Sequence, residues 1–241
     1  MRKGSLWKVV PSVLTTVNLF CGFYGIIAAL SEEFFRAAIA ILIAVVFDGL
    51  DGKIARLTKT TSSFGVEYDS LADLLSFGLA PGLILYLWAL QPVGGFGWLA
   101  AFIFVSCGAL RLARFNVQAP QTSGFHFTGL PIPAAAGMVA SLILLGKDFM
   151  TFAEPRPMMV LGVACGLAFL MVSNIKYRSF KNFHLKGRHP NWLLLLVIPT
   201  FALILKPELL ISTIFVLYIV SGPVEQVVAH HRIVRESRAH P

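Results

Sequence analysis

Long apolar stretches run through the whole chain, and short polar or basic segments separate them. Stretches near 20 residues are long enough, at 1.5 Å per residue, to cross a hydrocarbon core about 30 Å thick. The pattern predicts eight membrane-spanning helices, at residues 11–30, 34–57, 66–90, 96–117, 132–150, 157–175, 190–205 and 207–228. The last two are short and Pro207 separates them, so a re-entrant hairpin is the alternative for that pair. The predicted fold is an all-α polytopic membrane protein.

The composition agrees with this interpretation. Hydrophobic residues make up 56% of the 241 residues, and charged residues only 13%. Soluble domains carry a charged fraction of about 25%. The balance excludes a soluble globular domain and an intrinsically disordered chain, and we interpret residues 1–241 as a single membrane domain in contact with the lipid bilayer.

The net charge of +8 comes from basic residues in the segments between the apolar stretches. With the N-terminus in the cytoplasm, 16 of the 20 Lys and Arg residues fall on the cytoplasmic side, and the others are Arg36, Lys147, Arg156 and Lys206. Such a bias orients membrane proteins, so the charge needs no nucleic-acid partner. We expect a protein of the cytoplasmic membrane, with both termini and the active site facing the cytoplasm.

Four carboxylates lie where the second and third predicted helices approach the cytoplasmic side. Asp48 and Asp51 are three residues apart, and Asp69 and Asp73 are four apart, so each pair shares one helix face. Two helices joined by a short turn can point all four side chains into one cleft. A carboxylate at membrane depth costs on the order of 2 to 3 kcal/mol, so something must compensate these acids.

Two divalent ions would neutralise four carboxylates, and ligation by oxygen alone favours Mg²⁺ or Mn²⁺. Gly52, Ala55 and Gly65 lie on the same faces and leave room for a flat or extended ligand. Arg56, with Lys53 or Lys59, offers charge to a phosphate. The alternative is an ion or proton pathway, which is the commoner role of acids inside membranes but does not require the small residues.

The acidic segment resembles the signature of the CDP-alcohol phosphatidyltransferase family, D-x2-D-G-x2-A-R-x8-G-x3-D-x3-D. All eight fixed positions match, over 26 residues: Asp48, Asp51, Gly52, Ala55, Arg56, Gly65, Asp69 and Asp73. The segments PSVLTTVNLFCGFYGI, YDSLADLLSFGLAPG, RLARFNV and GLPIPAAA are similar to one branch of the family, the bacterial and archaeal integral-membrane phosphatidylserine synthases.

The resemblance implies a reaction in which CDP-diacylglycerol and L-serine give phosphatidylserine and CMP, with two divalent cations bound. It implies that Asp48, Asp51 and Asp69 hold the metals, and that Asp73 helps to hold one and is the base. The four remaining signature residues would shape the CDP pocket, and Lys59 would add charge there. It further implies a six-helix catalytic core, here residues 11–175, an additional helix pair at 190–228, and a homodimer.

For the carboxylate of serine, the sequence offers Arg111 and Arg114 at the cytoplasmic end of the fourth predicted helix, near Asn116. Each arginine could instead only mark the membrane boundary. The signature does not specify the acceptor, so a sister enzyme that uses glycerol 3-phosphate or inositol is an alternative. A divalent-cation channel or transporter built on the same aspartates is the alternative of a different class.

Overall fold

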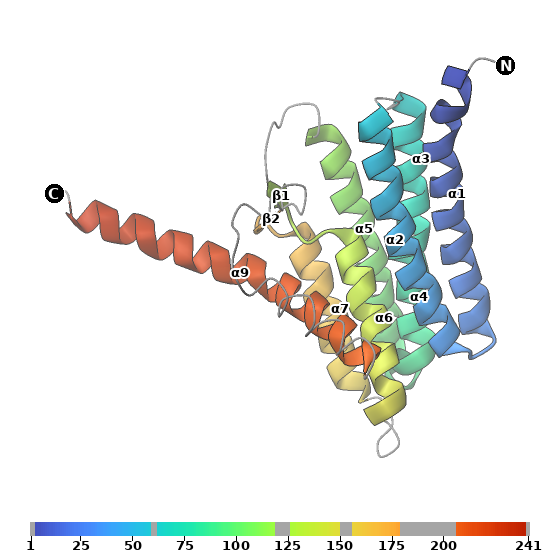
Figure 1. The fold of residues 1–241 in the computed structure, drawn as a ribbon. Coiled ribbons are helices and arrows are strands. Elements are labelled where there is room, and N and C mark those ends of the chain that lie inside the picture. Colours follow the sequence, from blue (N-terminus) through green and yellow to red (C-terminus); the bar gives the residue numbers. More distant parts are fainter. Residues whose placement is uncertain (1–2, 59–61, 119–125, 150–155, 179–205, 240–241) are drawn as a thin grey trace.

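The computed structural model describes residues 3–58, 62–118, 126–149, 156–178 and 206–239, and these residues are mostly helical. Figure 1 shows most of the helices side by side in one bundle, with the last helix crossing it obliquely. The long helices are α1 (Lys3–Leu30), α2 (Phe34–Thr58), α5 (Gly95–Gln118), α6 (Ile132–Phe149), α7 (Pro157–Val172) and α9 (Pro207–Ala239). Each covers most of one predicted span, because apolar length determines which segments can cross a membrane.

The third predicted span is helical throughout, over Ser63–Val93, but it is not a uniform α-helix. The α-helices α3 (Ser63–Asp73) and α4 (Ala80–Leu85) alternate with the π-helices η1 (Leu74–Leu79) and η2 (Tyr86–Leu90), and the short 3₁₀ helix η3 (Gln91–Val93) ends the segment. π-Turns inside α-helices are rare and frequently occur at functional sites. Here the first one begins directly after Asp73.

Small side chains set the packing of the bundle. α1 packs along α2, α5 along α7, and α2 along α6. Ala37, Ala38 and Ala44 on α2 are fully buried. Without a hydrophobic force between helices in lipid, association depends on such close approach of backbones. The small residues therefore hold α2 tightly in the bundle, which fixes the position of the acids near its end.

Among the described residues, four helices are long and apolar enough to cross a membrane: Val10–Leu30, Ser63–Val93, Gly95–Gln118 and Pro207–Val228. Ile132–Gly146 and Pro157–Val172 are shorter apolar helices. These helices indicate a multi-pass membrane protein, whereas the predicted count of eight is not confirmed. The seventh predicted span, at 190–205, lies outside the described residues.

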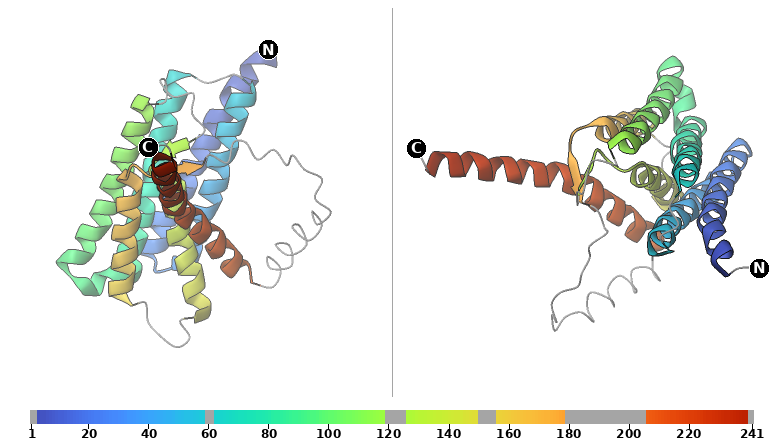
Figure 2. Two further views of the ribbon diagram at one scale, coloured as in Figure 1. Left: turned by 90° about the vertical axis from the view of Figure 1, so that its left-hand side faces the viewer. Right: turned by 90° about the horizontal axis from the view of Figure 1, so that it is seen from above.

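Two features in the second half of the chain were not predicted. β1 (His126–Thr128) and β2 (Lys176–Arg178) form a small antiparallel sheet in which Phe127 pairs with Tyr177. α9 continues beyond the predicted boundary at 228 and leaves the bundle, as Figure 1 and the view from above in Figure 2 show. Its apolar span ends near Val228, but nothing in the charged sequence that follows breaks a helix.

Pro223 lies inside α9, where its ring nitrogen cannot donate to the carbonyl of Ile219 one turn earlier. The Tyr177 hydroxyl donates to that carbonyl instead, at 3.3 Å. The Tyr177 ring also packs against Gly222, where a side chain would overlap it. The small sheet thus anchors α9 to the bundle at the position of the proline.

Candidate active site

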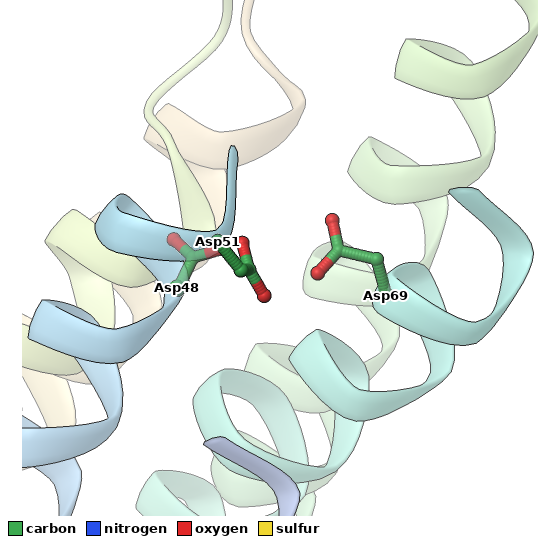
Figure 3. A group of neighbouring side chains, drawn as sticks. All are labelled: Asp48, Asp51 and Asp69. Carbon is green, nitrogen blue, oxygen red and sulfur yellow. The ribbon is translucent and has the colours of Figure 1, made fainter. Parts of the chain in front are cut away.

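Three of the four predicted carboxylates meet between α2 and α3. Asp48 and Asp51 come from α2 and Asp69 from α3, and each has a ligand oxygen within 4.8 Å of the others. Figure 3 shows the three carboxylates pointing toward one another across the space between the two helices. The spacing in the sequence predicted this convergence, because each helix presents its acids on a single face.

Asp73 lies one turn beyond Asp69, outside this group of three but close enough to Asp48 and Asp69 to interact with them electrostatically. Its side chain is only 8% exposed. The fourth predicted acid is therefore buried next to the other three.

Two polar side chains of α1 bind the acids. Thr15 Oγ1 donates to Asp51 Oδ2 at 2.9 Å, and Asn18 Nδ2 donates to Asp73 Oδ1 at 3.0 Å. Both α1 residues are buried. A buried carboxylate needs such donors, because an unpaired one would lose its hydration without compensation. α1 thus orients one carboxylate on α2 and one on α3.

A close contact between α1 and η1 holds Asn18 in place. Ser76 Oγ donates to the backbone carbonyl of Asn18 at 2.9 Å. A Cβ atom at Gly22 would lie 2.6 Å from Ser76 Cα, so only glycine permits this approach. The π-turn that follows Asp73 is therefore fastened to the helix that donates to Asp73.

The chemistry of the site fits divalent cations. Asp69 Oδ1 is buried and has no hydrogen-bond partner among the described residues. The three neighbouring carboxylates offer only oxygen atoms, which hard ions such as Mg²⁺ and Mn²⁺ prefer. A cation between α2 and α3 would supply the unpaired oxygen with a partner and offset the repulsion among the acids.

The small residues of the predicted nucleotide pocket lie on the same two helices. Gly52 and Ala55 follow the acids along α2, and both are half-buried. Gly65 is in the first turn of α3, where its amide donates to the Ser62 side chain at 3.0 Å and helps to start the helix. Arg56 is in α2 but its side chain is outside the described residues, as is the whole of Lys59.

The structure distinguishes the three residues predicted for the acceptor. Arg111 is buried, interacts electrostatically with Asp73 and Asp48, and leaves Nε without a hydrogen-bond partner among the described residues. Arg114 instead donates to Asn174 Oδ1 at 2.6 Å and to the Val172 carbonyl at 3.3 Å. Arg111 therefore lies near the acids, and Arg114 connects α5 to the end of α7.

Asn116, the third of these residues, forms hydrogen bonds with Ser70 on α3. Its Nδ2 atom donates to Ser70 Oγ at 2.9 Å, and the Ser70 hydroxyl also lies 3.3 Å from Asn116 Oδ1. This pair links α5 to the helix that carries Asp69 and Asp73.

Sequence analysis did not identify Thr15 and Asn18 as site residues. A signal was present, since both are polar, lie three residues apart on one face of an apolar helix, and would be costly in lipid. Their spacing relative to the acids carries no information, because the contacts join residues 36 and 55 positions apart.

Comparison with known proteins gives concordant matches. The family described as CDP-alcohol phosphatidyltransferase matches residues 8–177. A Helicobacter pylori protein named CDP-diacylglycerol–serine O-phosphatidyltransferase is 37% identical over 212 residues, which cover 88% of each chain. A Bacillus subtilis protein of the same name is 36% identical over 71% of this chain and 91% of its own. An archaetidylserine synthase of Methanothermobacter thermautotrophicus is 35% identical over 73% of this chain and 72% of its own.

Proposed function

The chain belongs to the CDP-alcohol phosphatidyltransferase family, and from this premise we propose that it transfers the phosphatidyl group of CDP-diacylglycerol to L-serine. The products are phosphatidylserine and CMP. The names of the relatives, two CDP-diacylglycerol–serine O-phosphatidyltransferases and an archaetidylserine synthase, support serine as the acceptor. The observation that carries the proposal is the convergence of Asp48, Asp51 and Asp69, three acids of the family signature.

Asp48, Asp51 and Asp69 would hold two divalent cations, with Asp73 as a further ligand of one. Bound there, Mg²⁺ or Mn²⁺ supplies charge stabilisation for the phosphate oxygens and for the departing CMP. The protein itself holds the carboxylates in a fixed arrangement, since Thr15 and Asn18 bind two of them from α1. Preorganised groups of this kind need no rearrangement during the reaction.

In the transfer, the serine hydroxyl oxygen forms a bond to the phosphorus that carries diacylglycerol, and the bond from that phosphorus to CMP breaks. The hydroxyl proton must leave, and Asp73 is the acceptor that we assign to it. Its Oδ1 accepts from Asn18, which leaves the other carboxylate oxygen to take the proton. Its buried position next to the three acids assigned to the cations supports this role.

CDP would lie along the half-buried stripe of Gly52 and Ala55 and reach Gly65 on α3. Side chains larger than these would occupy the space that a flat nucleotide needs. We assign Arg56 and Lys59 to the phosphates, since a guanidinium binds phosphate oxygens in pairs.

On the acceptor side, we assign Arg111 to the serine carboxylate. A buried guanidinium is costly unless its donors are paired, and Arg111 Nε lacks a hydrogen-bond partner among the described residues. Arg114 and Asn116 have protein partners and instead hold α5 against α7 and α3. These contacts favour a structural role for both residues.

The protein would act in the cytoplasmic membrane, with its termini and its site facing the cytoplasm and as a homodimer. The bias of basic residues between the two sides supports the orientation. The dimer follows from the family resemblance alone. Neither a different acceptor alcohol nor an ion-conducting role has an observation of its own in its favour.

One assay tests the proposed function. Purified protein in detergent, with CDP-diacylglycerol and Mn²⁺ or Mg²⁺, would be given L-serine, glycerol 3-phosphate or inositol in separate reactions. We expect CMP and phosphatidylserine to form in equal amounts with serine, and no lipid product with the other two. The Asp69→Asn variant is the control for a contaminating activity. Preferential transfer to another acceptor would contradict the proposal.

A further inference from the structure

We propose that Tyr218 of α9 completes the acceptor site, where its hydroxyl and the Arg111 guanidinium together bind the carboxylate of the amino-acid acceptor. This inference rests on the proposed function. It adds a specificity residue from outside the catalytic core predicted at residues 11–175. α9 would then contribute to the selectivity for the acceptor.

Arg111 provides the first half of this anchor. Its side chain is 8% exposed, and its guanidinium carbon lies 5.8 Å from the centre of the Phe115 ring. The Phe115 ring covers one side of the cation. Nε is buried and has no hydrogen-bond partner among the described residues, so the guanidinium retains a donor for a ligand. A carboxylate is the ligand that this planar donor set binds best.

Tyr218 provides the second half. It is half-buried on α9, and its phenol and the Arg111 guanidinium are close enough to interact electrostatically. The Tyr218 ring lies 5.7 Å from the Tyr177 ring, centre to centre, at an angle of 40°. That ring contact holds the phenol of Tyr218 beside the small sheet.

α9 has little freedom to carry Tyr218 away. Ser212 Oγ donates to the Ser141 carbonyl on α6 at 3.3 Å, one and a half turns before Tyr218. One turn after Tyr218, Gly222 packs against the Tyr177 ring. Tyr218 is therefore held between two anchored points on the same helix.

The chemistry of the pair suits an amino-acid acceptor. A phenol oxygen can accept from the guanidinium and at the same time donate its own proton to a carboxylate oxygen. The acceptor would then be bound through two donors of different geometry. A buried site that donates hydrogen bonds to a substrate group rejects an analogue that lacks the group, because the polar atoms of the site would then be left unpaired.

Tyr177, whose ring contacts the Tyr218 ring, has a different function. The Tyr177 hydroxyl donates to Ile219, and Tyr177 is fully buried. Tyr177 therefore anchors α9, whereas Tyr218 interacts with Arg111. The two roles can be separated by experiment.

The test compares L-serine with L-serinamide, which keeps the hydroxyl and the amine but lacks the carboxylate. In the Tyr218→Phe variant we expect the KM for serine to rise by about tenfold or more, as for a lost hydrogen bond to a charged group. The KM for serinamide and the KM for CDP-diacylglycerol should stay near their original values. Tyr86→Phe, the same change at a partly buried residue of η2, is the matched control and should alter none of them.

The anchor also predicts coupling between its two members. In an Arg111→Ala background, Tyr218→Phe should raise the serine KM much less than it does alone, because the carboxylate has already lost its main partner. Independent effects of the two changes would show that they do not share a ligand.

The inference is overturned if Tyr218→Phe leaves both the serine KM and the ratio of serine to serinamide unchanged. If the variant is inactive, thermal stabilisation decides: loss of stabilisation by serine alone supports the anchor, and loss of stabilisation by CDP-diacylglycerol as well overturns it. Wild-type protein that forms no phosphatidylserine would instead overturn the proposed function.

Discussion

At the scale of single residues, the four acids of the site do not have equivalent surroundings. Asp48, Asp51 and Asp69 form a compact group, whereas Asp73 lies outside that group and accepts a hydrogen bond from Asn18. This difference favours separate roles, in which the first three hold cations and the fourth also accepts a proton.

We predict that Asp73→Asn loses transfer to serine by a factor of about 10² to 10⁴, the usual contribution of a general base. The variant should still bind CDP-diacylglycerol in the presence of Mn²⁺, measured as a shift in melting temperature. Asp69→Asn should lose both binding and turnover, because it removes a member of the compact group. Glu67→Gln, an exposed acid on the same helix, is the control.

Two results would contradict this division. Near-normal turnover in Asp73→Asn would exclude Asp73 as the base. Complete loss of metal-dependent binding in the same variant would make Asp73 chiefly a metal ligand.

The acids could be predicted from the sequence, whereas their partners could not. Asp48 and Asp51, like Asp69 and Asp73, lie at helical spacing, so local geometry alone brings each pair to one face. Asn18 reaches Asp73 only because α1 packs against α3 and η1, which no short-range pattern encodes. For the same reason the sequence offered Arg111 and Arg114 as equals, and only their neighbours in the fold distinguish them.

At the scale of elements, the junction between α9 and the small sheet links the C-terminal helix to the site. The Tyr177 side chain is fully buried there, fills the space beside Gly222 and supplies the hydrogen bond that Pro223 cannot make. The junction has no room for an added atom.

We predict that Gly222→Ala lowers the melting temperature in detergent and raises the serine KM, because the new methyl group would overlap the Tyr177 ring. Overpacking of this kind costs about 1 to 3 kcal/mol. Gly162→Ala on α7 is the matched control, since among the described residues no atom beyond the backbone of its own helix turn lies within 4 Å of the added Cβ. Alanine at position 162 should be neutral or slightly stabilising. Equal melting temperatures for the two variants would show that α9 is not tightly packed at Gly222.

Apolar length predicted the positions of the long helices, because a helix must be continuous to satisfy its backbone in lipid. It did not predict that Leu74–Leu79 forms a π-helix, since side-chain polarity is the same for either hydrogen-bond pattern. β1 and β2 are three residues each, too short for an alternation to be recognised. Tertiary contacts decide these features.

At the scale of the whole molecule, the orientation in the membrane follows from the distribution of charge. The turn between α1 and α2 contains Ser31, and the start of α3 contains Ser63; both residues are exposed. The two positions lie at opposite ends of α2, so they should face opposite sides of the membrane.

We predict that a membrane-impermeant maleimide labels Ser31→Cys in intact cells, and labels Ser63→Cys only after the cells are permeabilised. The background protein would have Cys21, Cys107 and Cys165 replaced by alanine, and retained activity would check its fold. Labelling of Ser63→Cys from outside would place the acidic site on the wrong side of the membrane for a cytoplasmic nucleotide substrate.

The acids and the α1 residues that bind them all lie within the first 73 residues, whereas Tyr218 follows about 145 residues later. Chains emerge from the ribosome at about 5 to 20 residues per second, so this delay is on the order of ten seconds. The part of the site that would hold cations and nucleotide can therefore assemble while the chain is still being made. On the role proposed for Tyr218, the growing protein gains its selectivity for serine last, when its final helix docks.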